Sequence, residues 1–114
     1  MRTTISARGF SRKTLERDIR RYARHMLGRL RRPITHAELA LKEEDAEPVG
    51  GMHVCTLRLR LRGSADVVVL ARGAGKIAAL TSAFRWARYE LMRRRAAKRL
   101  PSTAWQDQVQ AASG

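Results

Sequence analysis

The chain has 114 residues, and its 24 Lys and Arg against 10 Asp and Glu give a formal net charge of +14 at pH 7. This length allows one domain with a modest core, and no apolar run is long enough to span a bilayer. Cys55 is the only cysteine, so no internal disulfide can form. The N-terminus lacks the apolar stretch of a signal peptide. We therefore expect a cytoplasmic protein, bacterial in origin, with a polyanionic partner, above all a nucleic acid.

The charge is segregated along the chain. Residues 1–32 carry a net charge of +9, residues 33–52 carry −4, and residues 53–114 carry +9. Arginine far outnumbers lysine, which suits bidentate contacts with phosphate and stacking on bases. An anionic membrane is disfavoured as the partner, because the first helix offers Tyr22 as its only aromatic anchor.

The N-terminal segment predicts a short strand followed by a long helix. Residues 2–8 alternate in the period of a strand, and Ser11 is a good N-cap for a helix that runs to about Arg32, before Pro33. An apolar stripe at helical spacing is formed by Leu15, Ile19, Tyr22, Met26 and Leu30. A basic stripe opposite it is formed by Lys13, Arg17, Arg20, Arg24 and Arg31.

Like charges one turn apart destabilise an isolated helix by roughly 0.2–0.5 kcal/mol per pair. The basic stripe therefore indicates a partner with many negative charges, and the alternative interpretation is a solvated helix face.

Three further strands are predicted in the middle of the chain. Residues 34–42 alternate between apolar and polar, with Ala37, Leu39 and Leu41 facing inward. An acidic loop follows over 43–52. In residues 53–62 the leucines alternate with Arg58, Arg60 and Arg62, which indicates one apolar and one basic face. The turn at Gly63-Ser64 predicts antiparallel pairing with 65–72. Residues 67–70 are all apolar and leave the orientation of that strand open.

A second helix is expected from about residue 74 to 100. Its apolar stripe consists of Ile77, Leu80, Phe84, Ala87 and Leu91. The same line continues with Arg94, Arg95 and Lys98, which cannot be buried unpaired. We therefore expect the last two turns to project beyond the sheet and to contribute little to folding. Residues 101–114 are predicted to be a disordered tail.

These elements predict an α+β fold of order β-α-β-β-β-α, with two helices packed on one face of a four-stranded sheet. The crossover makes the first two strands parallel and right-handed. The domain covers residues 1–100, followed by the tail over 101–114.

Catalytic and cofactor sites find little support in the sequence. His53 and Cys55 share a strand face, but two ligands do not make a metal site, and Cys55 has no evident base partner. The segment Gly73–Lys76 resembles part of a phosphate-binding loop, yet the full pattern fails and a strand-to-helix turn is preferred. We expect no enzyme activity, no cofactor, no metal and no small-molecule substrate. Trp86 and Tyr89 are interpreted either as a base-stacking pair or as a cover for the helix edge.

The segments MRTTISARGF, TLERDIRRYARHMLGRL, HAELALKEE, VCTLRLRLRG and KIAALTSAFRWARYELMRRR resemble the ribosome hibernation promoting factor family, also called ribosome-associated inhibitors. The resemblance implies a stress-response protein that occupies the decoding channel of the small ribosomal subunit, contacts ribosomal RNA through basic helices and inhibits translation. It implies RNA binding by Lys13, Arg17, Arg20, Arg21, Arg24, Arg85, Arg88, Arg93, Arg94, Arg95, Lys98 and Arg99.

Two features depart from the family pattern. The start of the second helix, GAGKIAALTSAF, lacks the acidic residues common there, and the chain ends at Gly114, so it resembles the short form. We expect a monomer when the protein is not on the ribosome. The alternative function is a general double-stranded RNA-binding or RNA-chaperone module.

Overall fold

The computed structural model of this chain describes residues 1–44 and 52–99. Two short irregular helical turns, η1 and η2, interrupt the expected order of elements. In chain order the elements are β1 (Arg2–Ala7), α1 (Arg12–Tyr22), η1 (Ala23–Leu27), η2 (Gly28–Arg31), β2 (Ile34–Glu44), β3 (Met52–Leu61), β4 (Ser64–Gly73) and α2 (Lys76–Arg99). The predicted disordered tail at 101–114 lies outside the described residues.

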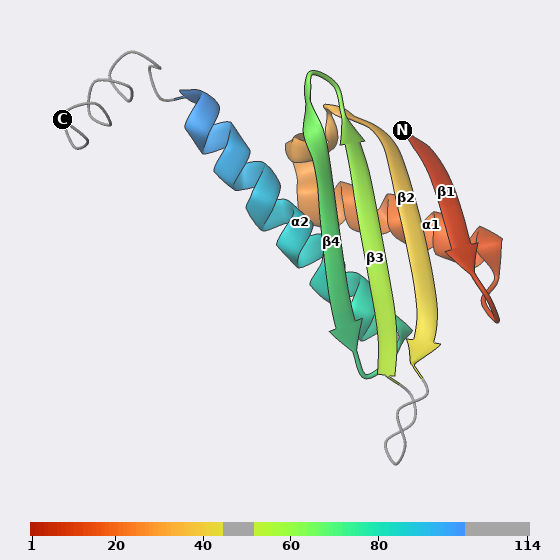
Figure 1. The fold of residues 1–114 in the computed structure, drawn as a ribbon. Helices are drawn as coiled ribbons and strands as arrows, with labels where there is room; N and C mark the ends of the chain where they lie inside the picture. The colour runs from red at the N-terminus through yellow and green to blue at the C-terminus, as the bar shows by residue number, and fades with distance from the viewer. Residues whose placement is uncertain (45–51, 100–114) are drawn as a thin grey trace.

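The strands form one sheet in the order β1-β2-β3-β4, with β1 and β2 parallel and the other neighbours antiparallel. Both helices lie on the same face of this sheet (Figure 1). The predicted α+β fold, its element order and its pairing are therefore confirmed.

Buried side chains run across the sheet in rows, because paired residues in neighbouring strands point to the same face. Ile5 pairs with Leu39, Leu39 with Leu57, and Leu57 with Val69, and all four are buried. Parallel rows contain Ala37, Leu59 and Val67, and Leu41, Cys55 and Ala71. The register settles the orientation of β4, because Val67, Val69 and Ala71 face the helices whereas Val68 and Leu70 are exposed.

The helix α2 packs closely against the end of β4. A Cβ atom on Gly73 would lie 2.5 Å from the backbone nitrogen of Ala79, so only glycine fits at this position. The buried face of α2 comprises Ala79, Leu80, Ala83, Phe84, Ala87 and Leu91. The predicted stripe is confirmed except for Ile77, which is 65% exposed.

The first helix is shorter than predicted. The regular α1 ends at Tyr22, and a π turn and a 3₁₀ turn replace its expected continuation to Arg32. Gly28 has φ +55°, a conformation that glycine adopts without steric cost. The irregular turns bury Ala23 and Leu27, so Met26 and Leu30 are only partly buried.

Arg94 connects helix α2 to the β3–β4 hairpin through hydrogen bonds. Its Nη1 donates to Ser64 Oγ at 3.1 Å and to the carbonyl oxygen of Ala65, and its Nη2 donates to the carbonyl oxygen of Asp66 at 3.1 Å. Its Nε donates to Glu90 Oε1 at 3.1 Å. The prediction that Arg94 projects beyond the sheet is therefore wrong, because the hairpin end supplies the polar partners that the sequence did not reveal. Arg95 is exposed as predicted.

The Arg94 contacts predict a difference between neighbouring arginines. Arg94→Gln should lower the free energy of unfolding by about 1.5–3 kcal/mol, the range for hydrogen bonds made by a charged group. Arg95→Gln removes an exposed guanidinium on the same turn and should change stability by less than about 0.5 kcal/mol. Urea unfolding of the two variants measures this difference, and equal stabilities would contradict the role of Arg94.

A pH dependence follows from Glu90. Hydrogen bonds from Arg93 and Arg94 hold the pKa of this carboxyl below its ordinary value. A lowered pKa in the folded protein stabilises it above the ordinary carboxyl pKa, and this contribution is lost as the pH falls through the lowered value. The stability difference between the protein and Glu90→Gln should be largest at neutral pH and should shrink as the pH falls below the ordinary pKa of a carboxyl group. A difference that does not depend on pH in urea titrations would contradict this assignment.

Candidate nucleic-acid interface

The sheet face without helices carries arginines that are already neutralised. Arg58 Nε lies 2.8 Å from Asp66 Oδ2, and Arg60 Nη2 lies 3.2 Å from Glu38 Oε1. These pairs connect neighbouring strands and neutralise Arg58 and Arg60. These two arginines therefore attract a polyanion less than cations without an anionic partner do.

The outer side of α1 carries a row of exposed cations. Only one of them has an anionic partner among the described residues, since Arg20 Nη2 lies 3.6 Å from Glu16 Oε1. That pair is exposed on both sides and contributes little to stability. The row contains the predicted residues Lys13, Arg17, Arg20, Arg21 and Arg24. Arg31, predicted to extend the basic stripe, lies instead beyond the break at Gly28 and donates from Nη1 to the Gly28 carbonyl at 3.0 Å.

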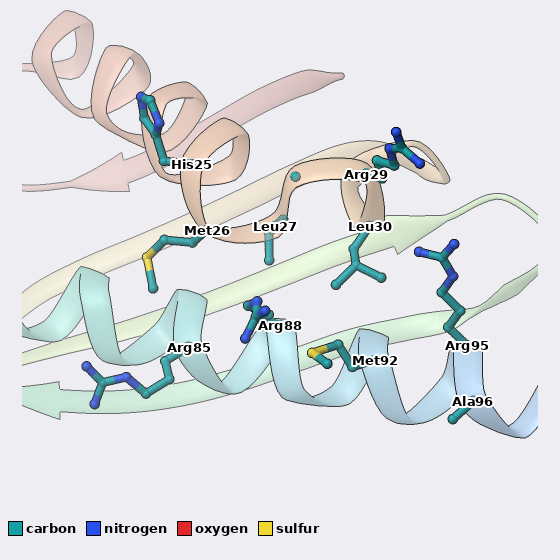
Figure 2. Close-up of a pocket in the computed structure, with 11 residues that line it drawn as sticks. His25, Met26, Leu27, Arg29, Leu30, Arg85, Arg88, Met92, Arg95 and Ala96 are labelled. Carbon is teal, nitrogen blue, oxygen red and sulfur yellow. The ribbon is translucent and has the colours of Figure 1, made fainter.

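A second cationic feature is a groove of about 1030 Å³ between α2 and the turns η1 and η2. Figure 2 shows its two sides, with His25 and Arg29 on the turns and three arginines on α2. Those arginines are Arg85, Arg88 and Arg95. We call this feature the interhelical groove.

The cations of the interhelical groove are not neutralised from within the part of the chain that the structure describes. None of its four arginines forms an ion pair with a described carboxylate, in contrast to Arg58 and Arg60 on the opposite sheet face. Cations gathered along one groove repel, and an anion bound among them would relieve this repulsion. The groove is therefore a candidate binding surface for phosphates.

The structure divides the predicted basic residues of α2 into three groups. Arg85, Arg88 and Arg95 line the groove, whereas Arg93 and Arg94 both contact the carboxylate of Glu90. The side chains of Lys98 and Arg99 lie outside the description. Sequence reasoning missed His25 and Arg29 as groove residues, and the signal available for them was Gly28, which breaks the helix between them.

Trp86 and Tyr89 lie on α2 but do not line the groove. Their ring centroids are 6.3 Å apart in an edge-to-face arrangement, and the residues are 58% and 63% exposed. They border a shallow depression beside the edge strand β4, where Val68 and Leu70 are also exposed. Both interpretations of this pair, base stacking and a cover for the helix edge, stay predictions.

The polar groups considered for catalysis or metal binding have other roles in the structure. Cys55 is buried and burial raises the pKa of its thiol to about 12, while His53 packs edge-to-face on Phe10 at 5.6 Å. Lys76 Nζ lies 3.7 Å from Asp18 Oδ2, which links α2 to α1. No group of three or more His, Cys, Asp or Glu within the described ranges is placed to hold a metal ion. None of the described helices is long and apolar enough to cross a membrane.

Solved structures with a similar fold include two that cover most of this chain. A ribosomal subunit interface protein from Coxiella burnetii matches with a TM-score of 0.62 and 13% identity, over 84% of this chain and 99% of that chain. The N-terminal domain of Thermus thermophilus Protein Y matches with a TM-score of 0.58 and 22% identity, over 82% of this chain and 98% of that chain.

No protein-family model and no curated protein matches the chain. At these identities the likeness establishes the fold, and it is the fold that the resemblance in the sequence implied.

The burial of Cys55 predicts an unreactive thiol. A thiol with a pKa of about 12 carries almost no thiolate at neutral pH. We expect a disulfide reagent such as Ellman's reagent to label the protein at neutral pH only after unfolding in denaturant. Rapid stoichiometric labelling of the folded protein would contradict this burial.

Proposed function

We propose that this protein binds the small ribosomal subunit, lies in the decoding channel and inhibits translation there. The observation that carries the proposal is the asymmetry of charge, since all but one cation of the α1 row and all four groove arginines lack anionic partners among the described residues, whereas Arg58 and Arg60 are paired. The fold it shares with a ribosomal subunit interface protein supports the ribosome as the partner. Ribosomal RNA is the polyanion that such a surface would contact.

The proposed contacts come from both helices. Helices α1 and α2 lie on the same face of the sheet (Figure 1), so one RNA surface could reach both the row on α1 and the groove arginines of α2. Phosphate contacts of this kind position the protein without reading base sequence. Inhibition then follows from occupancy, because a channel filled by protein cannot accept messenger or transfer RNA, and no bond is made or broken.

The remaining basic residues take lesser parts in the proposal. Arg93 contacts Glu90 and Arg94 mainly holds the β3–β4 hairpin, while Lys98 and Arg99 are proposed as RNA contacts from the sequence alone. The protein acts in the cytoplasm and needs no cofactor. A general double-stranded RNA binder is the competing function, and it would spread across all RNA-containing fractions of a sucrose gradient instead of following the subunits.

Two charge-matched variants test the proposal. Arg85→Gln/Arg88→Gln removes two unpaired cations, and Arg58→Gln/Arg60→Gln removes two paired ones, so both lower the net charge equally. Binding to purified small subunits should weaken steeply with salt because phosphate contacts release counterions. The first variant should lower the salt slope by about two units, and the control should leave it almost unchanged.

Three outcomes would contradict the proposal. These are binding that does not depend on salt, equal losses in the two variants, and cleaved RNA in a translation reaction. In a cell-free reaction we expect inhibition in proportion to the subunits occupied, as steric exclusion requires.

A further inference from the structure

We propose that the interhelical groove binds a single-stranded segment of RNA, with its phosphates on the arginine walls and its unstacked bases on the groove floor. The inference depends on the proposed function only in taking RNA as the partner. It assigns a ligand class to the groove and adds Met26, Leu30 and Met92 to the binding residues.

The floor of the groove is apolar, unlike its walls. Met26 and Leu30 are partly buried and face α2, and Met92 on α2 is 46% exposed to the groove (Figure 2). Phosphates gain nothing from thioether and aliphatic groups, whereas the flat faces of bases do. An apolar strip between two cationic walls therefore matches a strand that presents both phosphates and bases.

The groove also has room for such a strand. Gly28 lacks a side chain, and a Cβ atom there would meet no other atom within 4 Å. Ala96 at the same groove is exposed and small. The volume of about 1030 Å³ is slightly above the range for small-molecule sites, about 300–1,000 Å³, and suits a few linked nucleotides.

An RNA duplex makes poor use of this arrangement. A-form RNA keeps its bases stacked inside and presents phosphates and 2′-hydroxyls outside. It would contact the arginines of the walls while leaving the apolar floor in water. The groove should therefore prefer single strands over duplexes of equal charge.

The exposed aromatic pair is a weaker candidate for binding bases. Trp86 and Tyr89 lie on α2 outside the groove, where the adjacent Arg93 and Arg94 are both bound to Glu90. The bases of an RNA strand placed there would have aromatic rings to stack on, but its phosphates would meet few unpaired cations. This surface provides the matched control.

The experiment measures affinity for a fluorescently labelled oligouridylate of about ten nucleotides, within the usual site sizes of single-strand binders. An RNA duplex with the same number of phosphates is titrated in parallel. Met92→Gln and Tyr89→Gln each replace an exposed side chain on α2 by glutamine without changing the charge. Thermal melting verifies that both variants fold, and Met92→Trp supplies a stacking surface at the floor.

We expect Met92→Gln to weaken oligouridylate binding about three- to tenfold, with an unchanged salt slope and an unchanged affinity for the duplex. Met92→Trp should strengthen single-strand binding, and Tyr89→Gln should leave it unaltered. The proposal is overturned if no oligouridylate binds, if Met92→Gln has no effect, or if Tyr89→Gln carries the loss. Failure of subunit binding alone would reject the proposed function and leave this inference standing, because no ribosome takes part in the titration.

Discussion

Both helices must bury their apolar faces on the same side of one sheet, and the distribution of charge in this protein follows from that constraint. The rows through Leu39, Leu57 and Val69 present a continuous apolar surface that α1 and α2 cover together. Tyr22 stacks on Phe84 with ring centroids 5.6 Å apart, which brings the two helices into contact. The cations opposite these buried faces consequently gather in one layer instead of being spread over the molecule.

Carboxylates decide which of these cations remain available. Glu38, Asp66 and Glu90 each contact arginine, on the sheet face or at the β3–β4 hairpin. Among the described carboxylates, only Glu16 forms an ion pair with a cation of the α1 row. None of them pairs with an arginine of the interhelical groove. The positions of the ten acidic residues therefore matter as much as their number, because they decide which of the 24 basic residues are neutralised.

Two glycines give the helix layer its shape. Gly73 lets the start of α2 approach the sheet within a distance that excludes any side chain. Gly28 takes φ +55° and turns the chain from η1 into η2, which opens the groove beside Met92 and Arg95. The groove therefore results from the backbone conformation at Gly28, where the first helix is interrupted.

The sequence by itself determined the element order, the pairing of the hairpin and the basic face of α1. Periodicity carries this information, because Cys55, Leu57 and Leu59 alternate with polar residues and Leu15 and Ile19 lie one turn apart. Only the tertiary structure decided the orientation of β4, the exposure of Ile77, the hairpin contacts of Arg94 and the groove itself. These features depend on which distant residues meet, and local patterns of charge and hydrophobicity do not specify such contacts.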